Sequence, residues 1–355
     1  MSFEKPCYSK KAVNRAGAIL ASADIDFEKF TWALDVLANW RASHSYPINT
    51  FQATLRKKLK GIDRTGIVAE RLKRTLSIIA KLERYQSMEL ARMQDIGGLR
   101  AIVRGVAQVR MLEILYREAK FEHELTNSKD YISSPKPDGY RGVHLIYRYK
   151  NKRAPDYDGL HVELQLRTKL QHAWATAVET MGTFLRQALK SGLGDEEWRV
   201  FFELTSAGFA KIEKCPAVPD YETLSMPEIC IQVAESERKL RVLEKLRGFS
   251  VAANRITEGK GQGSYHLVML NYDDKSVTIT PYSVSRLAQA NKDYAEVELR
   301  ARNGEPVEAV LVSAGPIKAL KKAYPNYFLD THDFIKQVRK MLAIAQDYPL
   351  FKSAF

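Results

Sequence analysis

The clearest helical pattern in the sequence lies in residues 68–86, which read VAERLKRTLSIIAKLERYQ. At about 100° per residue, four apolar side chains of this segment project within one sector roughly 120° wide. These are Leu72, Leu76, Ile79 and Leu82. Basic residues fall on the opposite side, namely Lys73, Arg74, Lys81 and Arg84, with Arg71 at the border. The pattern predicts a helix that closes a core with one face and presents a row of cations on the other.

The segments around this helix predict an α/β (α+β) domain. Residues 14–42 have helical spacing of apolar positions, which Pro47 ends. Period-2 alternation predicts strands at IGGLRAIVR, VHLIYRYK and LHVELQLRT, and the 3.6-residue period predicts helices at 107–119 and 169–190. We therefore expect a small mixed sheet flanked by helices.

A change of composition at residues 214–228, KCPAVPDYETLSMPE, indicates a domain boundary. Beyond it the patterns predict helices at 228–247, 283–292, 316–323 and 331–346, a hairpin within 265–280 and a strand at 307–312. We therefore assign residues 1–214 to a first domain and residues 215–355 to a smaller C-terminal α/β domain.

Composition and charge narrow the class of protein. No apolar run approaches the ~18 residues that a membrane span needs, and the first residues are too polar for a secretory signal. The three cysteines have no C-x-x-C spacing, which favours a reducing, cytoplasmic location over a disulfide framework or a zinc site. The net charge is +13, and residues 51–150 hold 21 Lys and Arg against 11 Asp and Glu. Such a region either binds nucleotides or nucleic acid or is a solvated basic face.

Two carboxylates are the candidate catalytic and metal-binding residues. Asp95 precedes a predicted strand, and Glu163 shares the polar face of another strand with Gln165 and Arg167. Mg²⁺ is commonly held by one or two carboxylates together with phosphate oxygens, and phosphoryl chemistry needs Lys and Arg for the developing charge. The sequence contains no P-loop motif, and no predicted strand is followed by the motif G-x-G-x-x-G. Alternatively, Glu163, Gln165 and Arg167 form an ordinary solvated strand face that has no catalytic role.

The loop NSKDYISSPKPDGYRGVH, residues 127–144, adds cations and aromatic residues to this set. It contains Lys129, Lys136 and Arg141 around two tyrosines, in a segment whose Pro and Gly content is typical of a turn. His144, at its end, is either a phosphate ligand or a structural histidine. His172 and Trp174 on the following helix have the spacing of core or lining residues, and the isolated His332–Asp333 pair is typical of a helix start.

Four separated motifs together resemble the RelA/SpoT alarmone synthetase domain. They are ERLKRTLSIIAK, QDIGGLRAIV, SKDYISSPKPDGYRGVH and VELQLRT, and the resemblance covers roughly residues 45–200. It implies a nucleotidyltransferase-like fold and transfer of the β,γ-pyrophosphate of ATP to a ribose 3′-hydroxyl, with release of AMP.

The resemblance also implies roles for the donor side of the site. Arg71 and Lys73 match the pair that engages ATP, and Lys81 matches a triphosphate-binding lysine. Asp95 matches the Mg²⁺-binding aspartate, and Glu163 matches the second carboxylate, which positions the metal and activates the attacking hydroxyl.

On the acceptor side, the resemblance implies that Lys129 and Lys136 contact phosphates and that the acceptor base stacks on Tyr140. His144 matches the histidine that follows this tyrosine, and Gln165 and Arg167 complete the acceptor site. The loop would then clamp the acceptor nucleotide.

Two positions depart from the family loop, which usually reads Asn-Gly-Tyr followed, one residue later, by Ser. Here Asp138 replaces the amide and Gly142 replaces the serine. An aspartate changes what the loop can donate to a base or phosphate, and Gly142 removes a side chain beside the acceptor pocket. Both changes weaken the expectation of a GTP or GDP acceptor.

The chain resembles, more narrowly, the fused toxin–antitoxin synthetases of the CapRel type. Tyr324 and Tyr327 form a Y-x-x-Y element near the end of the second domain, like the element of those fusions that folds back on the nucleotide site. The resemblance implies a self-inhibited toxin that pyrophosphorylates the 3′-CCA end of tRNA and a phage protein as the releasing trigger. Both rings could instead pack in the core of the second domain.

Two alternatives to this function stay open. One is a (p)ppGpp synthetase that uses GDP or GTP. The other is a degenerate synthetase domain that only binds RNA or senses a ligand, although the presence of both Asp95 and Glu163 argues against it.

Overall fold

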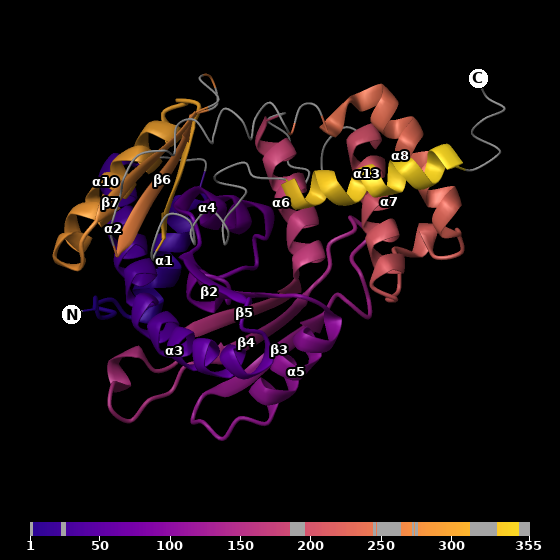
Figure 1. Ribbon diagram of the computed structural model, residues 1–355. Helices are drawn as coiled ribbons and strands as arrows, with labels where there is room; N and C mark the ends of the chain where they lie inside the picture. Colours follow the sequence, from indigo (N-terminus) through magenta and orange to yellow (C-terminus); the bar gives the residue numbers. More distant parts are fainter. Residues whose placement is uncertain are drawn as a thin grey trace.

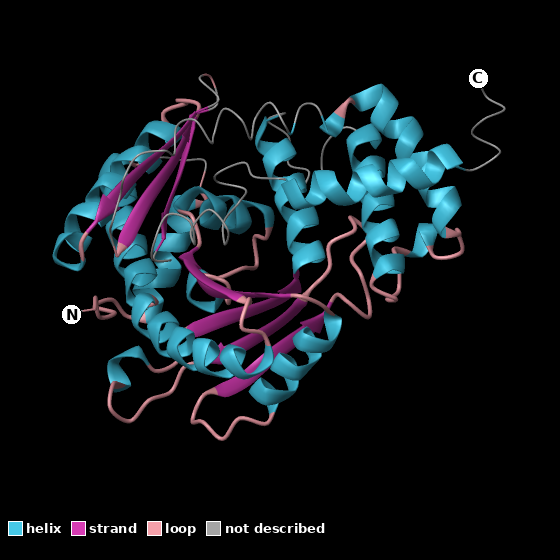
Figure 2. Cartoon of the chain, in the orientation of Figure 1, coloured by secondary structure: helices cyan, strands magenta, loops and turns pink. Residues whose placement is uncertain are grey.

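The computed structural model describes residues 3–22, 26–184, 196–243, 246, 264–271, 273, 276–312 and 332–347 (Figure 2). The helices longer than one turn in these ranges are α1 (Lys10–Leu20), α2 (Phe27–Ser43), α3 (Ser45–Ile62), α4 (Thr75–Arg84), α5 (Val106–Arg117), α6 (Lys169–Phe184), α7 (Glu196–Ile212), α8 (Met226–Leu240), α10 (Leu287–Arg302) and α13 (His332–Asp347). The strands are β1 (Ile67–Leu72), β2 (Gly97–Val103), β3 (Glu124–Asp130), β4 (Val143–Arg148), β5 (His161–Thr168), β6 (Tyr265–Asn271), β7 (Ser276–Tyr282) and β8 (Val307–Val312). None of the described helices is long and apolar enough to cross a membrane.

One mixed sheet runs through the molecule in the order β3-β4-β5-β2-β1-β8-β6-β7. β2 and β5 are parallel, and every other neighbouring pair is antiparallel. The first five strands come from residues 67–168 and form the predicted mixed sheet flanked by helices. β8 extends it by pairing with β1 at Arg71 and Val312, which joins the C-terminal strands to the N-terminal sheet.

The two faces of the five-strand sheet differ, as the alternation in β5 predicts. Val162, Leu164 and Leu166 are completely buried and share one core with residues of α3 and α5, the helices that lie along this face in Figure 1. The opposite face of β5 carries Glu163, Gln165 and Arg167. The apolar face fixes the sheet against its helices, so the polar face is left for other chemistry.

The predicted helix at 68–86 is wrong in its first third. Residues Ile67–Leu72 form β1, each paired with a residue of β2, and the helix α4 begins only at Thr75. The local helical periodicity is real, but pairing with β2 satisfies the backbone of these residues and buries Ala69 completely. Lys73 and Lys81 therefore do not share one helix, because Lys73 lies between β1 and α4.

The strand β3 was not predicted, because its sequence ELTNSKD has no apolar alternation and falls partly in the expected loop. It is an edge strand whose residues are half-buried or exposed, so burial leaves no period-2 signal. Two predicted helices also have different bounds. α8 begins at a capping box between Ser225 and Glu228, and α10 begins four residues later than expected and ends ten residues later.

The C-terminal half contributes helices and strands to two separate hydrophobic cores. α7, α8 and α13 share a core with α6, which rises from the sheet toward them in Figure 1. β6, β7, β8 and α10 form a smaller core of their own at the other end of the sheet. The predicted hairpin and the strand at 307–312 are present. The predicted helix at 316–323 lies outside the described residues, and the boundary between residues 214 and 215 stays a prediction.

Candidate active site

The polar sheet face brings residues from four strands into one row. Arg100 of β2 lies opposite Gln165 of β5, Gln165 lies opposite His144 of β4, and His144 lies opposite Lys129 of β3. Residues opposite each other in neighbouring strands point to the same face, about 5 Å apart. Glu163 lies in the next row, opposite Gly98 and Ile146. The candidate site is therefore a continuous polar strip across the middle of the sheet.

Five side chains of this strip close a ring of hydrogen bonds. Nδ1 of His144 donates to Oε1 of Glu163 at 2.8 Å, and Nε2 of His144 lies 2.5 Å from the hydroxyl of Tyr140. Nη2 of Arg167 donates both to this hydroxyl, at 2.8 Å, and to Oε1 of Gln165, at 3.0 Å. Nε2 of Gln165 then donates to Oε2 of Glu163 at 2.9 Å. The ring fixes both oxygens of Glu163.

The charges in the ring stabilise one another. Burial alone would raise the pKa of Glu163, but the charge and hydrogen bond of His144 hold it well below its usual value. Burial alone would lower the pKa of His144, but Tyr140 and Glu163 raise it to about 9. Glu163 is therefore ionised and His144 is protonated at neutral pH.

The raised pKa of His144 predicts a pH-dependent stability. Its proton is bound more tightly in the folded protein, with a pKa of about 9, than at the ordinary value of 6.5. The resulting stabilisation is complete below pH 6.5 and is lost as the pH rises toward 9. Tyr140 acts in the opposite sense above its lowered pKa of about 8, so the window to use is pH 6.5 to 8.

Within that window the free energy of unfolding of the wild type should fall, relative to that of His144→Gln, by up to about 1.4 kcal/mol per pH unit. Urea unfolding at several pH values measures this difference. A difference that does not change with pH would show that His144 is neutral in the folded protein.

A second cluster surrounds Asp95. Lys73 donates to Oδ2 of Asp95 and Lys81 donates to Oδ1, each at 2.9 Å. Burial alone would raise the pKa of Asp95, but these two charges hold it below its usual value. The negative charge of Glu163 acts on Asp95 in the opposite direction, so the two carboxylates interact electrostatically. Two ammonium groups on one carboxylate leave the cluster with a surplus positive charge suited to a phosphate.

Three residues that were not predicted hold the segment around Lys73. Nε of Arg41 donates to the carbonyl of Lys73 at 2.9 Å, and its guanidinium lies over the ring of Tyr294 at 4.7 Å. At the first turn of α4, Glu298 accepts from the N–H of Leu76 at 3.3 Å and also accepts from the hydroxyl of Tyr294. Arg41 and the α10 residues are far from Lys73 in the chain, so no local pattern could identify these contacts.

The loop between β3 and β4 is held by its own turn and by helix α7. Oδ1 of Asp138 accepts from the N–H of Tyr140 at 2.9 Å, so the replaced amide position serves the loop itself. Gly139 has φ +87°, and a Cβ there would lie 2.9 Å from Cβ of Ser206, whose hydroxyl donates to the carbonyl of Gly139. Gly142 has φ +153°, and its Cβ would lie 3.2 Å from Cγ of Arg167. Both glycines are therefore required by the backbone and by close neighbours.

The remaining predicted site residues differ in their burial and in how far the structure describes them. Lys129 is exposed on β3, and Lys136 places Nζ 4.7 Å from the ring centre of Tyr131 and 5.1 Å from that of Tyr140. Tyr140 is only 9% exposed, and its ring packs in the core shared by α6 and α7. Arg71 is described only by its backbone in β1. Tyr324 and Tyr327 lie outside the described residues.

Helix α6 carries two residues considered in the sequence analysis, His172 and Trp174, and both are buried. Trp174 is a core residue that donates to the carbonyl of Phe202 at 2.8 Å. His172 is 6% exposed, and neither of its ring nitrogens has a hydrogen-bond partner among the described residues. Burial and the charges of Arg100 and Arg167 lower its pKa. His172 is therefore uncharged at neutral pH.

The described residues contain no cluster of three or more His, Cys, Asp or Glu able to hold a metal on its own. Asp95 and Glu163 are nonetheless both ionised, and the charge of Glu163 acts on the pKa of Asp95. Two such carboxylates fit a Mg²⁺ ion whose other ligands are phosphate oxygens and water.

The part of the chain that contains this site is similar to known proteins. Residues 70–182 match the family model described as a region found in RelA / SpoT proteins. Over 135 residues the chain is 33% identical to GTP pyrophosphokinase YjbM of Bacillus subtilis (strain 168). This match covers 34% of this chain and 63% of that protein. Over 104 residues it is 27% identical to GTP pyrophosphokinase YwaC of the same organism, which is 29% of this chain and 49% of that protein.

Among solved structures, the small alarmone synthetase 1 of Bacillus subtilis bound to its product pppGpp is 25% identical, with a TM-score of 0.40, over 48% of this chain and 90% of that chain. The chain spans less than two thirds of the length of either curated relative. The matched residues include Asp95, Glu163 and the whole loop at 127–144. The family model and the two relatives support a RelA/SpoT synthetase domain in residues 70–182.

Proposed function

We propose that this chain is an ATP-dependent pyrophosphokinase. The observation that carries the proposal is the pairing of Lys73 and Lys81 with Asp95 beside the fixed, ionised Glu163. Lys73 and Lys81 bind the triphosphate of ATP and counter the charge that develops on it. Phosphoryl transfer requires mainly such positioning and electrostatic stabilisation.

In the proposed reaction a ribose 3′-oxygen attacks the β-phosphorus of ATP. The bond from this phosphorus to the oxygen that bridges it to the α-phosphorus breaks, and AMP leaves with that oxygen. Glu163 accepts the hydrogen bond of the attacking hydroxyl and then its proton, while His144 keeps Glu163 in place. Asp95 and Glu163 would hold Mg²⁺, which neutralises charge on the phosphates when bound.

The proposed acceptor is the 3′-CCA end of tRNA. The positive surplus of residues 51–150 supports a polyanionic acceptor, because phosphate contacts dominate nucleic-acid affinity. The burial of Tyr140 beneath Lys136 and Arg167 also removes the stacking surface expected for a guanine base. The names of the relatives support the second candidate, a GDP or GTP acceptor that yields (p)ppGpp.

The two acceptors are separated by one experiment. The full chain is incubated with γ-labelled ATP and either deacylated tRNA, GDP or GTP, and the products are resolved. Label on the tRNA supports the tRNA acceptor. Label on GDP or GTP with none on tRNA would establish the second candidate, and label on no acceptor would contradict both.

We further propose that the C-terminal part restrains this activity. Tyr294 and Glu298 of α10 are 3% and 7% exposed and contact the first turn of α4, the helix that carries Lys81. A carboxylate at a helix N-terminus occupies a position that favours anions such as phosphate. The proposed toxin is released when a phage protein binds the C-terminal part.

The Y-x-x-Y element provides a test of this restraint. If Tyr324 and Tyr327 block the ATP site, replacing both by alanine should raise basal transfer and make expression toxic to the host. If both rings are core residues, the variant should instead lose several kcal/mol of stability. Transfer assays and thermal unfolding of the purified variant measure the two outcomes. A folded variant with unchanged transfer would contradict restraint at this element.

A further inference from the structure

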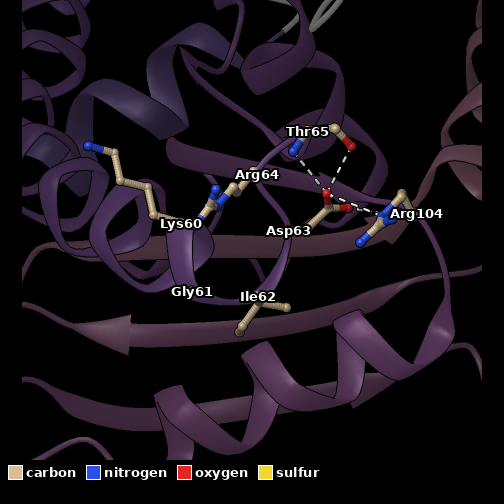
Figure 3. Close-up of a pocket in the computed structure, with 7 residues that line it drawn as sticks. All are labelled: Lys60, Gly61, Ile62, Asp63, Arg64, Thr65 and Arg104. Atoms are coloured by element: carbon tan, nitrogen blue, oxygen red, sulfur yellow. Dashed lines mark hydrogen bonds and ion pairs between the residues drawn. The ribbon is translucent and has the colours of Figure 1, made fainter.

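A basic pocket lies at the end of α3, and all of its lining residues except Arg104 precede the residues that match the RelA/SpoT region. It has a volume of about 420 Å³ and is lined by residues 60–65 and by Arg104 (Figure 3). Lys60 and Arg64 come from the end of α3 and the turn after it, and Arg104 follows the last residue of β2. Nothing in the proposed transfer reaction uses these residues.

The one carboxylate of the pocket is fully occupied by its own turn. Asp63 is 2% exposed, and its Oδ1 accepts from the N–H and the hydroxyl of Thr65 at 2.9 and 2.8 Å. Its Oδ2 accepts from the N–H of Arg104 at 2.9 Å, and Nε of Arg104 lies 3.4 Å from Oδ1. These dashed contacts are drawn in Figure 3. Asp63 therefore shapes the pocket and does not neutralise the other two cations.

Lys60 and Arg64 are exposed and form no hydrogen bond or ion pair with any described residue. The exposed Arg56 and Lys57, one turn earlier on α3, extend the same row and likewise have no such partner. By contrast, the exposed Arg148 of β4 has an acidic partner, Glu124, at 3.2 Å. Residues 56–65 thus form a concentrated patch of unneutralised positive charge.

The register of the sheet places this pocket near the loop at 127–144. Arg104 follows Val103, which lies opposite Thr168, and the loop ends at Val143, which lies opposite Leu166. Both therefore lie at the same end of the strands, in β2 and β4, two strand spacings or about 10 Å apart across the sheet. Helix α3, which carries Lys60, packs on the apolar face of the sheet, so an RNA bound at Lys60 and at Glu163 would pass around this end of the strands. Arg104 lies six residues after Gly98, which is the partner of Glu163 in β2. Six residues correspond to roughly 20 Å along the strand.

The geometry points to a second binding site, for the sugar-phosphate backbone of an RNA acceptor whose 3′ end lies at Glu163. This inference rests on the proposed RNA acceptor. A mononucleotide at Glu163 is too short to reach cations that lie roughly 20 Å away, whereas an RNA strand spans that distance. The pocket also contains no aromatic side chain on which a free nucleotide base could stack, and Ile62 is its largest apolar residue.

The test compares a double variant, which carries both Lys60→Gln and Arg64→Gln, with a matched control. The control is Arg148→Gln with Lys152→Gln, which removes the same charge from exposed residues at the opposite end of β4. Neither pair forms a hydrogen bond or an ion pair with Asp63, Asp95 or Glu163, so both variants should fold and melt like the wild type. KM is measured for deacylated tRNA and for GDP, and binding of a fluorescent RNA hairpin ending in CCA is measured at several salt concentrations.

The pocket variant should raise KM for tRNA and Kd for the hairpin about tenfold at 0.15 M salt. The slope of log K against log salt should become shallower by about 1.4 to 1.8, the effect of two lost phosphate contacts. Any use of GDP should not change, and the control should behave as the wild type. Unchanged hairpin affinity and salt slope would overturn the inference.

The remaining outcomes separate this inference from the proposed function. If the wild type labels no tRNA, the acceptor proposal fails, and the hairpin measurement still decides whether the pocket binds RNA. If the pocket variant loses GDP use as much as tRNA use, the pocket serves a free nucleotide, and the RNA inference is wrong. A wild type that does not bind the hairpin even at low salt would also overturn it.

Discussion

Glu163→Gln is expected to lower pyrophosphate transfer by at least about a hundredfold, the usual effect of removing one well-placed electrostatic group. The substitution keeps the shape of the side chain but removes the charge that holds the proton on His144 and that is proposed to bind Mg²⁺. Asp95→Asn should have an effect of the same size, because it removes the partner of Lys73 and Lys81. Turnover of the purified, folded variants with γ-labelled ATP measures both effects.

Glu124→Gln is the matched control, because Glu124 is an exposed glutamate of β3 that pairs with Arg148. It should retain wild-type turnover. Retention of more than about a tenth of wild-type turnover by Glu163→Gln or Asp95→Asn would remove that carboxylate from the mechanism. A further readout separates a charge effect from simple misfolding. Without the carboxylate the pKa of His144 should return toward its ordinary value, and NMR of the ring protons detects that change.

The parts of the site that could be predicted from the sequence are those that depend on local periodicity. Strict alternation in β5 identified Val162, Leu164 and Leu166 as the buried face, and all three are completely buried. Once that face is known, Glu163 and Gln165 must lie on the other face, because successive side chains of a strand alternate. The sequence also predicted that Asp95 lies just before a strand, and β2 begins at Gly97.

The parts that could not be predicted depend on contacts between distant segments. The segment at 67–72 fits a helical period, and only its pairing with β2 makes it a strand. The hydrogen-bond ring required Tyr140 to turn inward, which follows from contacts of its loop with α6 and α7. Arg141 of the same loop, expected to face an anion, is 3% exposed and pairs with Glu213 at 3.3 Å. None of these contacts leaves a signal in the residues nearby.

The inward turn of Tyr140 leads to the second large effect. If this residue acts mainly as a stacking surface for the acceptor base, Tyr140→Phe should retain activity, because phenylalanine stacks as well as tyrosine. In the structure the hydroxyl accepts from Arg167 and bonds to Nε2 of His144, while the ring is 9% exposed. We therefore expect Tyr140→Phe to lower kcat/KM for the acceptor about tenfold, which corresponds to about 1.4 kcal/mol.

The affinity for ATP should change little in Tyr140→Phe, since Lys73, Lys81 and Asp95 are not part of the ring. Tyr131→Phe is the matched control. Its ring contacts those of Tyr140 and His144 edge to face, but its hydroxyl forms no hydrogen bond with a described residue. Steady-state kinetics with ATP and acceptor varied in turn distinguish the two substrates. A Tyr140→Phe enzyme with wild-type acceptor kinetics would mean that the hydroxyl bonds do not position Glu163, and a loss confined to ATP would mean that the two substrate sites have been assigned the wrong way round.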